Sequence, residues 1–161
     1  TCGQGTAALE LIEEAGVPDI IVAPVGGGGL MSGTSTIAKA VKPGIKVIGA
    51  EPLNANDAWQ SLKSGHIIPS VNPKTVADGL LTSLSQLTFS VIKRNVDQIL
   101  TAREETIIEA MLLVWERMKI IIEPSSATVV AVIMENPGIF RNKKAGLIIS
   151  GGNVDFRKLP F

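Results

Sequence analysis

A run of four glycines, Gly26 to Gly29, constrains the fold of this chain more than any other feature. It follows a short apolar run rich in β-branched residues, Asp19 to Val25, and precedes a segment with helical spacing, Leu30 to Val41. A second apolar run, Lys46 to Ala50, comes next. This order of strand, glycine loop, helix and strand predicts a βαβ unit with two parallel strands.

Helix and strand patterns alternate along the rest of the 161 residues. The spacing predicts helices over 6–15, 54–65, 104–119 and 125–135, with Pro124 breaking the third of them. Further strands are expected over 97–102 and 145–149, and a proline-rich connection leads from the second helix to residue 79. The prediction is an α/β fold with one doubly wound, mostly parallel sheet.

Composition excludes several classes of protein. Lys plus Arg equals Asp plus Glu at 15 each and tyrosine is absent, so a nucleic-acid-binding function is not expected. No apolar stretch reaches the roughly 20 residues needed to span a bilayer, and no membrane association is expected. The single cysteine, Cys2, cannot form an internal disulfide, and no signal peptide is recognisable. We therefore expect a cytoplasmic protein.

Four consecutive glycines at the start of a helix favour an anion-binding loop. The free N–H groups and the helix dipole attract phosphate, and glycine lets a ligand approach the backbone closely. The run lacks the third glycine of a GxGxxG fingerprint and the Gly-Lys-Ser/Thr of a P-loop. Glu51 nevertheless ends the next strand, where a ribose-binding acid would stand in a dinucleotide site. Phosphate binding, dinucleotide binding and a tight βα turn all remain open.

Three other positions are candidates for a site. Ser150 ends the last predicted strand before Gly151-Gly152, so its hydroxyl should point into the same crevice as the glycine run. Glu51, the Ala55 carbonyl and Asp57 form an oxygen-rich group suited to Mg²⁺ or Ca²⁺, although a helix N-terminus attracts the same carboxylates. Glu123, before Pro124, is either an acid at the pocket or a helix-end charge.

Six short motifs occur together and in order along the chain. They are Gly3-Gln4-Gly5-Thr6, Pro24 to Leu30, Gly49-Ala50-Glu51-Pro52, Ala77-Asp78-Gly79, Glu123-Pro124 and Ser150 to Asp155. In this combination the chain closely resembles the C-terminal half of the serine racemases. These belong to the serine/threonine dehydratase family of fold type II pyridoxal-phosphate (PLP) enzymes, which share the tryptophan synthase β-like fold. The resemblance runs over essentially all 161 residues.

The resemblance implies a role for each candidate residue. Gly26, Gly27, Gly28 and Gly29, with Leu30, would cradle the PLP phosphate, Ser150 would bond the pyridine nitrogen, and Glu123 would lie near the cofactor. Glu51, Ala55 and Asp57 would hold Mg²⁺, or Mn²⁺ or Ca²⁺ in its place. Lys119 and Asn153 match positions that contact ATP, an allosteric activator in some of these enzymes.

The resemblance also implies an activity and a missing part. The family interconverts L- and D-serine and eliminates water from serine to give pyruvate and ammonia; dehydration of threonine or 3-hydroxyaspartate is the alternative, and a homodimer is expected. The family's Schiff-base lysine motif, Ser-Phe-Lys-x-Arg-Gly, does not occur here. Residues 1–161 are therefore expected to be the C-terminal part of the PLP-binding large domain, without the small domain or the catalytic lysine. Alone, the chain should be catalytically inactive, and a non-catalytic fragment or a dinucleotide-binding module remains the alternative of another class.

Overall fold

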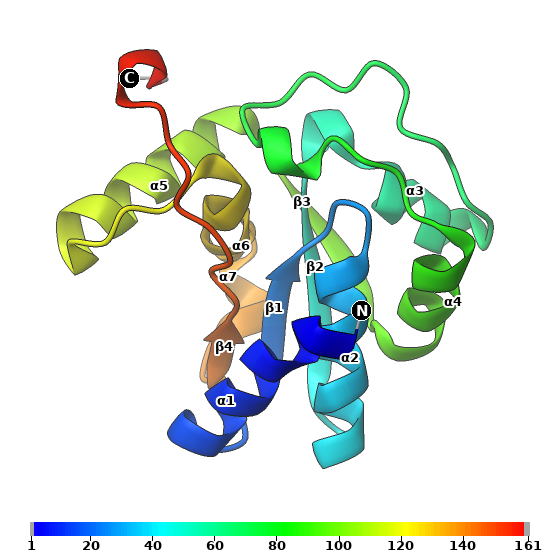
Figure 1. Ribbon diagram of the computed structural model, residues 1–161. Helices are drawn as coiled ribbons and strands as arrows, with labels where there is room; N and C mark the ends of the chain where they lie inside the picture. The colour runs from blue at the N-terminus through cyan, green and yellow to red at the C-terminus, as the bar shows by residue number, and fades with distance from the viewer. Residues whose placement is uncertain (1, 160–161) are drawn as a thin grey trace.

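The computed structural model describes residues 2–159 and contains a four-stranded parallel sheet (Figure 1). The strands are β1 (Ile20–Pro24), β2 (Lys46–Pro52), β3 (Gln98–Ala102) and β4 (Ala145–Leu147), in the order β3-β2-β1-β4. The central strand β1 pairs with β2 from Ile20↔Lys46 and with β4 from Ile20↔Ala145. All three pairings are parallel, so the predicted sheet is confirmed.

Helices cover both faces of the sheet (Figure 1). One face carries α1 (Thr6–Ala15), α2 (Gly29–Val41), α3 (Asp57–Ser64) and α4 (Gln86–Asn95). The other carries α5 (Glu104–Met118), α6 (Pro124–Glu135) and the short α7 (Pro137–Phe140). Short 3₁₀ turns occupy Cys2–Gly5, Leu53–Ala55, Asp78–Leu80 and Phe156–Lys158. The doubly wound prediction is therefore confirmed.

The core follows from the alternation of side chains along the strands. Ile21 and Ala23 of β1 pack under α1 and α2, whereas Ile20 and Val22 pack under α5 and α6. Every residue of β1 is buried. A parallel sheet covered on both faces needs strands that are apolar throughout, which is the pattern seen in the sequence.

The sequence-based assignment missed two helices, α4 and the short α7, and misjudged the end of α5. Helix α4 lies between the proline-rich connection and β3, where no element was predicted; it begins with a capping box in which Ser85 and Thr88 bond each other's backbone N–H. Threonine replaces the usual Glu or Gln of that motif, which hides the signal. Helix α5 ends at Met118 because Lys119 is left-handed (φ 59°), and Pro124 begins α6 instead of breaking α5. Within residues 2–159, no helix is long and apolar enough to cross a membrane.

Candidate functional site

A cavity of about 190 Å³ opens at the carboxyl ends of the strands, beside the glycine run. It gathers residues from four separate segments: Pro24, Gly26 to Leu30, Gly79, Leu80, Glu123, Ser125 and Ser150. All the residues expected at the cofactor from the sequence, Gly26 to Leu30, Glu123 and Ser150, line this one cavity. The crevice outside the carboxyl ends of parallel strands is where open α/β sheets bind their ligands.

The glycine run offers the cavity a set of unused hydrogen-bond donors. Among the described residues, none of the backbone N–H groups from Gly26 to Met31 donates to a protein acceptor. The first amide of this region that is bonded belongs to Ser32, which donates to the Gly28 carbonyl at 2.9 Å. These free amides lie at the positive end of the α2 dipole, so the loop can bind a phosphate group.

The glycines of the run differ in what surrounds them. Gly28 has a left-handed backbone (φ 80°), and a Cβ there would lie 2.7 Å from Leu84 Cδ2 and 2.9 Å from Ile92 Cδ1. At Gly26 a Cβ would come within 3.1 Å of the Gly79 carbonyl oxygen. At Gly29 it would meet no protein atom within 4 Å. Gly26 and Gly28 therefore allow close packing, whereas Gly29 leaves open space beside the cavity.

Glu123 fixes the loop that follows Ser150. Its backbone N–H donates to the Gly151 carbonyl at 3.1 Å, and its Oε2 accepts the Asn153 N–H at 3.0 Å. A Cβ on Gly151 would lie 2.7 Å from this carboxyl group, so a larger residue there would displace the Glu123 side chain. The Ser150 hydroxyl makes no hydrogen bond with another described residue and is free to bond a ligand in the cavity.

Sequence reasoning missed Gly79, Leu80 and Ser125 as parts of this cavity. Ser125 Oγ accepts the Gly79 N–H at 3.0 Å and is 3% exposed. The Ala77-Asp78-Gly79 motif marked the turn without giving it a role. A serine directly after Glu123-Pro124, at the start of a helix that faces the cavity, is the signal that could have identified Ser125.

The oxygen-rich group lies at a second position, at the end of β2 and in the turn that follows it. Glu51 is 1% exposed, and its two carboxylate oxygens accept the N–H groups of Ala58 (3.0 Å) and Trp59 (2.7 Å) at the start of α3. Burial raises the pKa of Glu51 to about 8, against the opposing effect of these two bonds. Glu51 therefore serves as an anchor for α3 whether or not it also binds a cation.

Asp57 has the properties of a ligand that lacks its partner. Asp57 is 3% exposed, and no hydrogen bond of normal geometry reaches either carboxylate oxygen from the described residues. Burial raises the pKa of Asp57, and the backbone N–H of Asp57 itself and then the Ser70 hydroxyl partly offset this shift. Asp57 and Ala55 line a polar hollow of about 150 Å³. In residues 2–159 no three His, Cys, Asp or Glu side chains are grouped so that they could hold a metal ion, so a cation here would need carbonyl or water oxygens as well.

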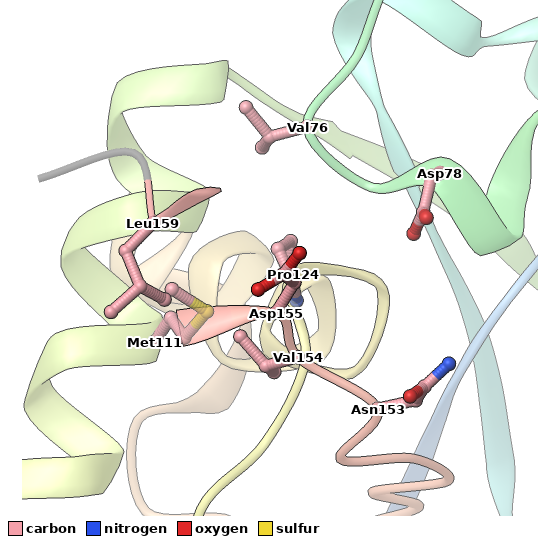
Figure 2. A pocket seen from close by; sticks show the side chains of 8 residues that line it. All are labelled: Val76, Asp78, Met111, Pro124, Asn153, Val154, Asp155 and Leu159. Atoms are coloured by element: carbon pink, nitrogen blue, oxygen red, sulfur yellow. The ribbon is translucent and has the colours of Figure 1, made fainter. Parts of the chain in front are cut away.

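The two residues expected at a nucleotide effector do not share a cavity. Asn153 lines a hollow of about 340 Å³ between the C-terminal segment and α5, in which Asp78 and Asn153 lie on one side and Met111 and Leu159 on the other (Figure 2). Lys119 caps the C-terminus of α5 and does not contribute to this lining. Of these two residues, only Asn153 lines this hollow.

Residues 1–151 match the family model of the pyridoxal-phosphate-dependent enzymes. The chain belongs to this family. A β-hydroxyaspartate dehydratase of Paracoccus denitrificans is 48% identical over 159 residues, which are 99% of this chain and 50% of that protein. The serine racemase of Dictyostelium discoideum is 53% identical over 163 residues, covering 98% and 50%. Its crystal structure superposes with a TM-score of 0.90 at 55% identity, covering 95% of this chain and 50% of that one.

Membership of the PLP-dependent enzymes makes this cavity a candidate site for PLP, which carries a phosphate and a pyridine ring. The cavity is lined by unpaired backbone amides and by a neutral hydroxyl. The open space at Gly29 is also what a close approach of a phosphate to the backbone requires. The chain spans about half the length of the curated relatives it matches.

Proposed function

We propose that the intact protein containing this chain is a PLP-dependent serine racemase that also eliminates water from serine to give pyruvate and ammonia. One observation carries the proposal: a single cavity is lined by both the unpaired glycine-loop amides and an uncharged partner, the Ser150 hydroxyl. Relatives of that name reach 53% identity across nearly the whole chain.

The glycine loop and Ser150 then have different roles in binding the cofactor. The amides of Gly26 to Leu30 bind the cofactor phosphate and fix the position of the ring. Ser150 donates to or accepts from the pyridine nitrogen without a charge, so it does not hold that nitrogen protonated as a carboxylate would. Bound PLP supplies an electron sink for negative charge at the substrate Cα. Because the Ser150 hydroxyl leaves the ring a weaker electron sink than a carboxylate partner would, neither outcome is strongly favoured. Both return of a proton to Cα and loss of the β-hydroxyl therefore stay accessible.

We place residues 1–161 in the C-terminal part of the PLP-binding large domain. The Schiff-base lysine and the small domain would come from a part of the protein outside this chain, so the chain alone should not turn over serine. The coverage of about half of each relative supports this division. We also propose that the intact protein is a cytoplasmic homodimer.

A divalent cation is proposed at the turn after β2. The Asp57 carboxylate, the Ala55 carbonyl and Glu51 would hold Mg²⁺, or Mn²⁺ or Ca²⁺; the unpartnered Asp57 oxygens support this assignment. The cation would stabilise the turn from 51 to 57 and not activate a water. We also propose that ATP contacts Asn153 in the hollow beside α5; Lys119, the other residue implied by the resemblance, lies outside the lining of that hollow.

Dehydration of 3-hydroxyaspartate, threonine or serine is the second candidate, and the 48% identical Paracoccus relative supports it. The structure argues against a dinucleotide site, because Glu51 is buried and both its oxygens already bond α3. A ribose-binding acid needs a free carboxylate in the crevice.

The test uses the intact protein loaded with PLP. Chiral chromatography of D-serine and a coupled assay for pyruvate are run with L-serine, beside assays for 2-oxobutyrate from L-threonine and oxaloacetate from L-threo-3-hydroxyaspartate. We expect D-serine and pyruvate from serine, and none from the 161-residue segment alone. Turnover confined to hydroxyaspartate or threonine would favour the second candidate, and binding of NAD in place of PLP would refute both.

A further inference from the structure

We propose that the two neighbouring serines at the start of α6 position opposite parts of the cofactor site: Ser126 positions Ser150, and Ser125 positions the turn against the glycine loop. Neither serine is assigned a role by the family motifs discussed above. The inference rests on the proposed PLP site but not on which amino acid the enzyme converts. Both are positioning residues, because each acts on the site through a backbone group that it holds.

Ser126 controls the peptide unit that directly follows Ser150. The Ser126 hydroxyl is 0% exposed, and its oxygen accepts the Gly151 N–H at 2.8 Å. That N–H belongs to the same planar peptide as the Ser150 carbonyl, so holding it fixes ψ of Ser150. The direction of the Ser150 side chain relative to the Ser150–Gly151 peptide, and so relative to the first turn of α6 that holds this peptide, is thereby fixed as well.

Gly151 is held on its other side by Glu123. The Gly151 carbonyl accepts the Glu123 N–H at 3.1 Å, so the first turn of α6 and the residue before it bond both polar groups of Gly151. Glycine would otherwise give this segment the widest choice of backbone angles. The two bonds remove that freedom directly beside the residue that should contact the pyridine ring.

Ser125 acts on a different wall of the same cavity. Its oxygen accepts the Gly79 N–H at 3.0 Å, and the Gly79 carbonyl oxygen lies 3.1 Å from the point where a Cβ on Gly26 would stand. The turn at Gly79 and Leu80 therefore packs closely against the first residue of the glycine loop. Loss of the Ser125 hydroxyl should loosen this support of the phosphate side and leave the Ser126–Gly151 bond in place.

The proposed roles of the two serines predict two distinguishable defects in the intact, PLP-loaded enzyme. Ser126→Ala should change the absorption band of bound PLP or its pH dependence and lower kcat about fivefold or more, with the Kd for PLP raised less than about threefold. Ser125→Ala should raise the Kd for PLP about fivefold or more and leave the absorption maximum of the bound fraction unchanged. Equilibrium dialysis and absorption titration measure these properties. Equal losses of the same property in both variants would overturn the proposal.

A double-mutant cycle separates positioning from a general loss of stability. If Ser126 acts through Ser150, Ser126→Ala should lower kcat less than about twofold further in a Ser150→Ala background. Full additivity of the two changes would refute the coupling. Ser90→Ala is the matched control, because Ser90 is an exposed serine on α4 whose hydroxyl bonds only the Leu87 carbonyl. If Ser126→Ala does not fold, Ser126→Cys keeps a side chain of similar size with a weak acceptor and should give the same result.

The outcomes also distinguish this inference from the proposed function. PLP affinity and absorption can be measured whichever substrate the enzyme uses. Suppose the enzyme makes no D-serine, but Ser126→Ala alters the absorption of bound PLP and Ser125→Ala weakens PLP binding. This result would overturn the racemase assignment and support the positioning roles. An enzyme that racemises serine while both variants keep wild-type absorption, affinity and kcat would overturn the positioning roles alone.

Discussion

Replacing two adjacent glycines, Gly28 and Gly29, by alanine should separate the stability of the fold from the binding of the cofactor. Gly28 is left-handed, which costs a residue with a Cβ about 1–2 kcal/mol. Its added methyl would also lie within 2.9 Å of three side chains, from Leu84, Thr88 and Ile92, and overpacking of this kind costs about 1–3 kcal/mol. Gly28→Ala should therefore lower the free energy of unfolding by about 2–5 kcal/mol.

Gly29→Ala is the matched control for the fold. Gly29 is the first residue of α2, its φ is not positive, and its added methyl would meet no protein atom. Alanine there should leave the free energy of unfolding unchanged or raise it by about 0.5 kcal/mol. Because Gly29 lines the cavity, however, its methyl takes up space beside the free amides and should weaken PLP binding about tenfold or more.

Urea unfolding of the intact protein without PLP, followed by circular dichroism, measures the first effect, and equilibrium dialysis with PLP measures the second. The reasoning is refuted if Gly28→Ala unfolds within about 0.5 kcal/mol of the wild type, or if Gly29→Ala is the less stable variant. Unchanged PLP affinity in Gly29→Ala would count against the phosphate cradle while leaving the account of packing intact.

Three further predictions concern the ring partner and the turn after β2. Ser150→Ala should lower kcat roughly tenfold or more while PLP stays bound, as judged by the absorbance of the desalted enzyme; loss of PLP would contradict separate phosphate and ring contacts. Asp57→Ala should abolish stimulation of the enzyme by Mg²⁺ or Ca²⁺, whereas Glu14→Ala, at an exposed acid on α1, should retain it; metal dependence that survives in Asp57→Ala would refute the cation site. Because burial raises the pKa of Glu51 from 4.5 to about 8, the folded protein holds this proton more tightly than the unfolded chain. The resulting stability is complete below about pH 4.5 and is lost as the pH rises through about 8, so urea unfolding of the metal-free protein should show a loss on the order of 2–3 kcal/mol from pH 6 to 9. Glu51→Gln should flatten this dependence, and an equal slope in that variant would show that another group titrates.

The strands and most helices could be predicted because their patterns are local. β1 is apolar at every position, and α1 spans the predicted residues, Thr6–Ala15. Helix α4 was missed because it has only two buried apolar residues, Phe89 and Ile92, and its cap uses threonine. That omission matters at the site, since Ile92 is one of the neighbours that requires glycine at position 28.

The parts of the site that could not be predicted depend on contacts between distant segments. The bond from Gly79 to Ser125 joins residues 46 positions apart, and the sequence contains no pattern that pairs them. The environment of Glu51 was equally hidden: the sequence shows an acid at the end of a strand, but only the fold directs both its oxygens to the start of α3. Residue types thus indicated which groups could act, and the packing decided which of them were free to do so.

The strand order explains why the glycine loop and Ser150, so far apart in the sequence, line one cavity. From β1 the chain passes through α2 to β2 and then to β3, on one side of the starting strand. It then returns through α5 and α6 to β4, which pairs with β1 on its other side, so the order of strands reverses between β1 and β4. The loops that leave two such strands diverge to opposite faces of the sheet and open a crevice between them. Gly26 follows β1 and Ser150 follows β4, so the topology places the two halves of the proposed PLP site at this reversal. The first turn of α6, which crosses back toward β4, bonds the loop after β4 through Ser126. Through Ser125 it bonds the Gly79 turn, which packs against the glycine loop.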